Sequence, residues 1–421
     1  HLRDLIAASD GAAETLRMLE QELADLSLLV NQQRSFRFAL QSQKFLHDAL
    51  QGLLLSIDSL QQNQQAAVAQ KLAWANQVTE LSRQHPLAKH TWATARTAIA
   101  HNQRYASQPT TLHDEDLMGL VPIGENPVTH YWEFYELRSA WDGLIDPREI
   151  PIPTHNPDGT ITVADDTGIV FVLLPGGPFL MGAQRLDPNR PNFDANARRS
   201  ESPLSRLELS PFFLARHELT QGQWLRLWNG EPHMREPSEY TAGRRVGQPI
   251  TLANPVESID WPACNTLLTQ HGMTLPTEAQ WEYGCRGGTT TPWCVPFEQL
   301  REYANFADAT AKAASAQWSS YESWRDGHTV HAPVGSFAAN AFGIHDAHGN
   351  VSEWCRERGG GYEIAARGGD GFRLTPGSAH CYRGANFGNP ASSGRSARRL
   401  ASEPSARLRN LGVRPARPLQ R

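Results

Sequence analysis

The residues best suited to chemistry lie between Asp346 and Trp354, in the order Asp-Ala-His-Gly-Asn-Val-Ser-Glu-Trp. Two carboxylates, those of Asp346 and Glu353, flank a loop that contains a glycine, an amide side chain and several backbone carbonyls. Calcium takes about six to eight oxygen ligands of these kinds. The stretch therefore favours a calcium loop. The alternative is that both carboxylates only cap turns or pair with arginines near the C-terminus.

Thiol chemistry is the second possibility that the composition raises. The five cysteines are Cys264, Cys285, Cys294, Cys355 and Cys381. No two of them form a Cys-x-x-Cys pair and their number is odd, so a disulfide framework of the secreted type is not expected. Buried free thiols are the expectation for such a chain.

Composition excludes several classes of protein. The chain has 421 residues, 40% hydrophobic and 20% charged, with 33 Gly and 28 Pro, which is typical of a globular protein rich in turns. Its net charge of -5 argues against binding to nucleic acids or anionic membranes. No apolar run reaches the roughly 18 residues of a membrane span. Residues 395–421 hold eight Arg and one acid, Glu403, and we expect most of these arginines to be structural.

The start of the chain bears on its origin. It begins at His1, without an initiator Met or a leader. We therefore expect a piece or a processed product of a longer protein. The lack of disulfide patterning favours the cytoplasm.

Two apolar seams near the N-terminus predict helices. The seams are Leu16, Leu19, Leu23, Leu26 and Val30, and then Leu46, Leu50, Leu53, Ile57 and Leu60. Such spacing buries one stripe of a helix against another helix. With a third helix around 68–81 and a shorter one at 91–100 after Pro86, the seams predict an α-helical bundle over residues 1–115. They could also join copies of the chain into an oligomer.

Beyond residue 115 the pattern changes to short β-like runs. Runs at 120–124 and 131–135, separated by an Asn-Pro turn, predict a β-hairpin and linker over 116–165. A strand is predicted at 168–174. Two helices follow, one from near Thr220 and one after Pro276, and the latter starts with the capping-box spacing of a Thr three residues before a Gln. The fold class expected is α+β.

Five separated motifs now point to one family. They are Pro175–Gly182 (PGGPFLMG), Pro211–Thr220 (PFFLARHELT), Leu275–Tyr283 (LPTEAQWEY), Asn340–Ile344 (NAFGI) and Gly349–Trp354 (GNVSEW). In this order they resemble the formylglycine-generating enzyme (sulfatase-modifying factor) family over residues 166–421. The resemblance implies a variant of the C-type lectin fold. The segment 120–138 and the ending 411–417 (LGVRPAR) are similar to a bacterial subgroup often attached to serine/threonine kinases, so an attached or associated kinase is an expected partner.

The resemblance implies calcium as the cofactor, at two sites. One would use the side chains of Asn305 and Asp326 with the carbonyls of Phe306 and His328, and the other the side chains of Asp346 and Glu353 with the carbonyls of Gly349 and Val351. Oxygen-only ligand sets of this kind suit calcium. Ser352 departs from the family, which usually has Trp there, without changing the ligand set.

The family's reactive residues are missing. The family oxidises cysteine with two thiols that form a copper site near the C-terminus. The resemblance places one cysteine position at Ser396 and the other near residues 391–393, and neither carries a thiol. A serine hydroxyl is not ionised at neutral pH and holds Cu(I) poorly. Cys381 lies before the matching stretch and is expected to be a packed thiol.

An iron-dependent sulfoxide synthase is the enzymatic alternative, since such enzymes also join a helical domain to this fold. They need three histidines, two of them one helical turn apart. The N-terminal histidines are His47, His85, His90, His101, His113 and His130, and no His-x-x-x-His pair occurs among them. A metal-dependent oxidase with unrecognised ligands therefore stays the alternative function.

The favoured function is binding without catalysis, of a protein or a small-molecule ligand, by a sensor or recognition module. The expected ligand-binding residues are Asn386, Phe387, Asn389, Ser392, Ser393, Arg395, Ser396 and Arg398. Small polar, aromatic and Arg side chains suit adaptable recognition. An ordinary irregular surface loop is the plainer reading. Lectin-fold variable proteins of diversity-generating retroelements diversify a comparable C-terminal segment, so residues up to Arg409 could form a variable surface.

Overall fold

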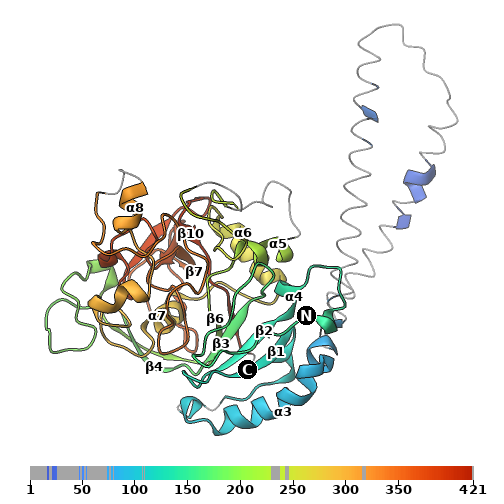
Figure 1. The fold of residues 1–421 in the computed structure, drawn as a ribbon, viewed down its shortest axis with the longest axis horizontal. Coiled ribbons are helices and arrows are strands. Elements are labelled where there is room, and N and C mark those ends of the chain that lie inside the picture. The colour runs from blue at the N-terminus through green and yellow to red at the C-terminus, as the bar shows by residue number, and fades with distance from the viewer. Residues whose placement is uncertain are drawn as a thin grey trace. The chain divides into compact units, whose positions relative to one another are not determined.

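The computed structural model describes residues 17–18, 21–25, 47, 50–51, 54, 74, 77–78, 80–106, 108, 110–228, 238–241, 246–314 and 319–419. The chain forms two compact units, residues 1–72 and 73–421 (Figure 1). In the first unit the described residues are helical, and Leu23 and Leu50 from the two predicted seams are exposed. The other seam positions, and with them the predicted packing of the two seams, lie outside the described residues.

The second unit mixes helices, strands and long irregular segments, as the α+β prediction requires. Its described helices are α3 (Pro86–His101), α4 (Leu137–Ala140), α5 (Gln221–Leu227), α6 (Trp261–Gln270), α7 (Glu278–Arg286) and α8 (Ala309–Ala314). Its strands are β1 (Leu120–Glu125), β2 (Trp132–Glu136), β3 (Val170–Leu174), β4 (Gly177–Met181), β5 (Ser205–Leu209), β6 (Phe212–Ala215), β7 (Ser352–Arg358), β8 (His380–Arg383), β9 (Arg399–Ser402), β10 (Leu411–Gly412) and β11 (Ala416–Pro418).

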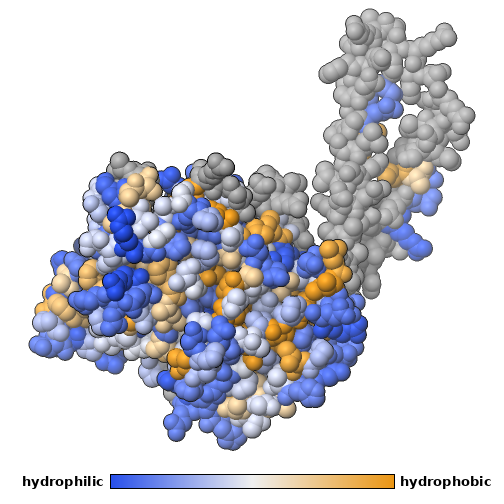
Figure 2. All heavy atoms as spheres, in the orientation of Figure 1, coloured by the Kyte–Doolittle hydropathy of each residue, from blue (hydrophilic) through white to orange (hydrophobic). Residues whose placement is uncertain are grey.

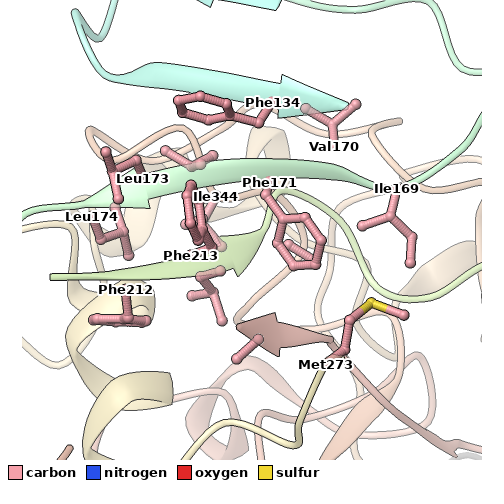
Figure 3. Close-up of a cluster of buried hydrophobic side chains, with 14 of the residues drawn as sticks. Phe134, Ile169, Val170, Phe171, Leu173, Leu174, Phe212, Phe213, Met273 and Ile344 are labelled. Carbon is pink, nitrogen blue, oxygen red and sulfur yellow. The ribbon is translucent and has the colours of Figure 1, made fainter. Parts of the chain in front are cut away.

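The larger sheet forms the centre of the core. Its strand order is β1-β2-β3-β6-β11, and each neighbouring pair is antiparallel. Every residue of β3 is buried, which explains the unbroken apolar run predicted as a strand. Figure 3 shows the rings of Phe134, Phe171 and Phe213, from three strands, close together, with centroids 5.2 Å apart for Phe134–Phe213 and 6.3 Å for Phe171–Phe213.

The hairpin expected as a linker belongs to this sheet. β1 and β2 are its first two strands, and β2 pairs with β3. Helix α3 packs against β1, and Trp92 stacks on Phe134 with ring centroids 5.5 Å apart. Burial of these rings ties α3 and the hairpin to the rest of the unit. The chain divides into its two compact units after residue 72, and the domain boundaries expected at residues 115 and 165 stay predictions.

Helix α3 also begins earlier than expected. The sequence predicts its start near Thr91, but Pro86 is the first helical residue. Proline fits a first turn because it has a preset φ and lacks an N–H that the turn does not use. His85 precedes it, and its ring Nδ1 accepts a hydrogen bond from the Leu87 N–H at 3.3 Å. The proline thus starts the helix instead of only interrupting it.

The smaller sheet and α7 position the segments of functional interest. The strand order of the smaller sheet is β10-β7-β8-β9, with β10 parallel to β7. β7 begins at Ser352, inside the predicted calcium loop, and residues 384–398 connect β8 to β9. The capping box predicted at α7 is confirmed, since Thr277 Oγ1 accepts from the Gln280 N–H at 3.1 Å and Gln280 Oε1 accepts from the Thr277 N–H at 3.0 Å.

One face of the molecule is mostly polar. Figure 2 shows hydrophilic side chains over most of one face, with apolar side chains in small separate groups. Within the described part of the chain, no helix combines the length and the apolar character needed to cross a membrane.

Candidate functional site

Three buried carboxylates meet one arginine beside the predicted calcium loop. This acidic cluster consists of Glu218, Asp346, Glu353 and Arg414, each 1% exposed. Arg414 Nη2 donates to Glu353 Oε1 at 2.7 Å, and Trp281 Nε1 donates to Glu353 Oε2 at 2.6 Å. The pairing of Glu353 with a C-terminal arginine, foreseen as the alternative to a metal, is therefore present. It does not account for the other two carboxylates.

The acidic cluster carries more negative than positive charge. Asp346 Oδ1 is buried and has no hydrogen-bond partner within the described part of the chain. Burial raises the pKa of Asp346 to about 7, although a hydrogen bond from the Gly335 N–H acts against it. Burial also raises the pKa of Glu218 well above its ordinary value, and the charges of Asp346 and Glu353 raise it further. Such a cluster needs either protons or a cation.

The second predicted calcium site shows the same signature. Asn305 Oδ1 and Asp326 Oδ2 are buried without a hydrogen-bond partner among the residues that the structure describes. Burial, together with the neighbouring carboxylate of Asp308, raises the pKa of Asp326 to about 7. Asp308, which sequence reasoning missed, accepts hydrogen bonds from Thr310 and Ala311 at the start of α8. Asp308 directly precedes a short alanine-rich helix, and this position could have identified it from the sequence as a helix-capping residue.

A chain of amide and carboxylate groups connects the two sites. Asn305 Nδ2 donates to Asn350 Oδ1 at 3.2 Å, and Asn350 Nδ2 donates to Glu218 Oε2 at 2.7 Å. The Val351 N–H donates to Glu218 Oε1 at 2.9 Å. Gly349 allows this close approach, because a Cβ there would lie 2.3 Å from the Asn305 carbonyl oxygen. Glu218 is the second residue that sequence reasoning missed, although it lies in one of the five motifs.

The donor set fits calcium better than a transition metal. No three His, Cys, Asp or Glu side chains in the described ranges converge closely enough to hold a metal by themselves. A cation at either site would therefore need amide and backbone carbonyl oxygens as well, which calcium accepts. The orphaned oxygens of Asn305, Asp326 and Asp346 are groups of this kind.

The segment with the family's cysteine positions holds no reactive thiol. Ser396 Oγ donates to the Pro292 carbonyl at 3.0 Å. The nearby His348 is neutral, because its Nδ1 donates to the Gly394 carbonyl at 2.7 Å while its Nε2 accepts from the Cys294 N–H at 3.0 Å. Burial lowers the pKa of His348 to about 4. The ring therefore has no proton-accepting nitrogen left for the thiol of Cys285, 3.6 Å away.

All five cysteines are free thiols in protonated form. Four are buried, as expected, whereas Cys294 is half-buried. Burial raises the pKa of Cys294 to about 12 and the pKa of Cys285 further. Burial also raises the pKa values of Cys264, Cys355 and Cys381 above the ordinary value. Without a bound metal, burial therefore favours the protonated thiol at every cysteine.

Most of the predicted ligand-binding residues are buried and make contacts within the domain. The buried ones are Asn386, Phe387, Arg395, Ser396 and Arg398. Asn386 Nδ2 donates to Ser352 Oγ at 3.1 Å, and Arg395 forms ion pairs with Glu201 and Asp194. Buried arginines of this kind hold irregular segments together. Only Ser392 is exposed, while Asn389 and Ser393 are partly exposed.

The exposed C-terminal surface lies further along the chain, between β9 and β10. We define the C-terminal loop as residues 403–410. Its exposed members are Glu403, Ser405, Arg407, Leu408 and Arg409. The loop is anchored by its backbone, since the N–H of Trp261 donates to the Pro404 carbonyl at 2.9 Å and the N–H of Ser258 to the Leu408 carbonyl at 3.0 Å. Its side chains can therefore change without loss of the anchoring bonds.

Two of the histidines considered for an iron site, His85 and His130, have separate roles. His85 precedes α3, and its Nε2 lies 3.2 Å from the Ile150 carbonyl oxygen. His130 pairs with Glu125 at 3.0 Å on the surface.

The comparisons with known proteins agree on the type of domain. The profile of the sulfatase-modifying factor enzyme 1-like domain matches residues 162–419. A formylglycine-generating enzyme of Thermomonospora curvata is 26% identical over 228 residues, which cover 44% of this chain and 71% of that enzyme. The serine/threonine-protein kinase pkn1 of Chlamydia caviae is 27% identical over 212 residues, which cover 47% of this chain and 29% of the kinase. The chain thus spans less than a third of that kinase.

Two solved structures resemble the fold more loosely. PvdO from Pseudomonas aeruginosa matches with a TM-score of 0.46 and 25% identity, covering 61% of this chain and 96% of PvdO. Treponema denticola variable protein 1 matches with a TM-score of 0.45 and 19% identity, covering 64% of this chain and all of that protein, at 100%. Because the matched profile spans more than half of the chain, this chain belongs to the sulfatase-modifying factor enzyme 1-like family.

Proposed function

We propose that this chain is a non-catalytic binding module on a family scaffold. The observation that carries the proposal is the state of the thiols. Ser396 stands at a cysteine position of the family and is tied to the Pro292 carbonyl, and burial raises the pKa of every cysteine in the chain. Thiol-based copper oxidation needs thiolates that this environment disfavours. What remains is a rigid domain with an exposed C-terminal loop.

Calcium is the proposed cofactor of the scaffold. The orphaned, buried oxygens of Asn305, Asp326 and Asp346 support it, as does the excess of carboxylates over guanidinium groups in the acidic cluster. Bound calcium would supply positive charge to these oxygens and would hold irregular backbone in place. Its role would be structural, with no part in a reaction.

The proposed recognition surface is the C-terminal loop. Leu408 is 39% exposed beside the exposed side chains of Arg407 and Arg409. An apolar side chain among guanidinium groups can bury area and donate hydrogen bonds to a partner protein or ligand. The kinase relatives support the proposal that an attached or associated kinase responds when this module binds its ligand. Sequence diversification in this loop would leave the buried arginines of the domain untouched.

The absence of catalysis is tested with copper. The purified protein is loaded with Cu(I), desalted and assayed for bound copper and for oxidation of a synthetic cysteine peptide. The formylglycine-generating enzyme of Thermomonospora curvata serves as the positive control. We expect no retained copper and no oxidised peptide. Stoichiometric copper together with peptide conversion would overturn the proposal.

The recognition surface is tested with two matched libraries. One randomises Ser405, Leu408 and Arg409, and the other randomises Asn386, Phe387 and Ser396. Both are displayed on yeast and selected against lysozyme as the probe. We expect well-expressed binders from the first library, because its side chains are exposed, and loss of expression in the second, because its side chains are buried. Binders arising only from the second library would contradict the proposal.

A further inference from the structure

A separate pocket lies away from the C-terminal loop. It has a volume of about 600 Å³ and is formed by the turn between β1 and β2, residues 158–160, residues 294–303 and residues 338–345. The side chains that matter for its chemistry are Arg104, Asp158, Arg216, Cys294 and His345. A volume of this size falls in the range of small-molecule sites, about 300–1,000 Å³.

Two buried polar atoms in the lining residues lack a protein partner. Arg216 uses its Nη1 for Glu133 at 2.6 Å and its Nη2 for the Gly159 carbonyl at 2.7 Å, but its Nε finds no acceptor in the described part of the chain. His345 lies 2.7 Å from the Phe337 carbonyl through Nδ1, so Nδ1 carries the proton and Nε2 is an acceptor. That Nε2 has no donor among the described residues either. Buried polar groups are normally satisfied, so these two atoms point to a missing ligand.

The charges of the pocket balance. The guanidinium of Arg216, 1% exposed, faces the buried carboxylate of Glu133. At the exposed edge, Arg104 contributes a positive charge and Asp158 a negative one. Once Glu133, which pairs with Arg216 but does not line the pocket, is counted, the charges balance, which disfavours a ligand with net charge and favours a neutral one that carries both signs.

Apolar side chains form part of the remaining lining, alongside polar ones such as Asn126, Thr129 and Tyr303. The apolar ones include Val128, Val295, Ala338 and Ala341. We propose that this pocket binds a free amino acid with a large apolar or aromatic side chain. Its carboxylate would be recognised by the guanidinium groups, its ammonium by Asp158 and His345, and its side chain by the apolar wall. This site is independent of the recognition surface proposed above.

Cys294 makes the proposal testable. It lines the pocket and is half-buried, whereas the other four cysteines are buried, so alkylation reports on this position alone. The intact chain, in calcium buffer at about pH 9 to raise the small thiolate fraction of Cys294, is treated with iodoacetamide and followed over time by mass spectrometry. Cys294→Ser is the control for labelling at other positions. Three probes are compared. L-Phenylalanine carries both a carboxylate and an ammonium group, 3-phenylpropionate carries only the carboxylate, and phenethylamine carries only the ammonium group.

We expect L-phenylalanine to slow the labelling of Cys294 about tenfold at about ten times its Kd, since only the empty fraction reacts. The two probes with one charge should protect far less. Arg104→Gln and Asp158→Asn, both at exposed positions, should abolish protection while the melting temperature stays unchanged. Absence of protection, equal protection by a singly charged probe, or protection that survives both substitutions would overturn the proposal.

Discussion

Two buried charge clusters of this domain differ in their balance. The paired cluster contains Glu278, Glu282, Arg286, Arg383 and Arg399, and it joins α7 to β8 and β9. Arg383 Nε donates to Glu278 Oε1 at 2.8 Å, and its Nη1 donates to Glu282 Oε2 at 3.1 Å. The acidic cluster around Asp346 has three carboxylates for one guanidinium. One cluster supplies its own counter-charges and the other does not.

The pKa values express this difference. Burial opposes the ionisation of Glu278, but the charges of Arg399 and Arg383 outweigh burial and lower the pKa to about 2. Burial raises the pKa of Asp346 to about 7, and the single arginine does not offset it. A self-sufficient network needs no counter-ion from the solution, although removal of one partner would leave an uncompensated buried charge. An unbalanced network makes the fold depend on what the solution supplies, which is the physical basis for expecting calcium.

The largest effect should come from breaking the paired cluster. Arg383→Met leaves Glu278 and Glu282 buried with one guanidinium fewer, and we expect a loss of about 3–5 kcal/mol in the free energy of unfolding. Urea denaturation followed by tryptophan fluorescence measures it. Arg407→Met is the matched control. The Nε of Arg407 lies 3.6 Å from Asp260 Oδ2, and the arginine side chain is 41% exposed. The free energy of unfolding of this variant should therefore fall by less than about 1 kcal/mol. Equal losses for both variants would remove the distinction.

Calcium removal should be next in size and should act on the acidic cluster and the Asn305 site only. Calcium at about 100 times its Kd is expected to stabilise the fold by about 2.7 kcal/mol relative to the chelated protein. Thermal unfolding in calcium and in EGTA measures the difference. Asp326→Asn should shrink it, while Asp370→Asn, in a partly exposed pair with Arg367, should leave it intact. Identical melting curves in calcium and EGTA would refute the calcium proposal.

A substitution at Gly349 should have an intermediate effect. Gly349→Ala places a Cβ 2.3 Å from the Asn305 carbonyl oxygen, so the connection between the two proposed calcium sites must shift. We expect a loss of about 1–3 kcal/mol from overpacking. Gly368→Ala is the control, because nothing lies within 4 Å of a Cβ there. Equal stability of the two variants, compared by urea denaturation, would contradict the close approach.

The smallest effect concerns pH. Glu357 contacts the paired cluster, and burial, followed by the charge of Glu278, raises its pKa from 4.5 to about 8. The folded state therefore holds this proton more tightly than the unfolded state. Its contribution to stability is complete below pH 4.5 and is lost as the pH rises through about 8.

Glu357→Gln mimics the protonated acid and should flatten this decline. Melting temperatures of the two proteins, measured across that pH window, test the expectation. Parallel curves would show that Glu357 ionises normally in the fold.

Local features of the sequence determined local features of the structure. The capping box of Thr277 and Gln280, the apolar run of β3 and the turn between β1 and β2 act over a few residues, and each forms where predicted. The five motifs were enough to identify the family because each keeps its own short pattern. The loop from Asp346 to Glu353 was visible for the same reason.

Contacts between distant residues decided the rest. Folding brings Glu218 to the proposed cation site at Asp346 and Asp308 to the proposed cation site at Asp326. Arg395 likewise pairs with Asp194, which lies 201 residues earlier in the sequence. The burial of Asn386 and Phe387, and the place of the hairpin in the larger sheet, depend on which apolar surfaces meet. The sequence alone determined the caps, strands and motifs, because those energies are local. Only the tertiary structure decided which charges share a site and which side chains face solvent, because burial and electrostatic pairing depend on residues far apart in the chain.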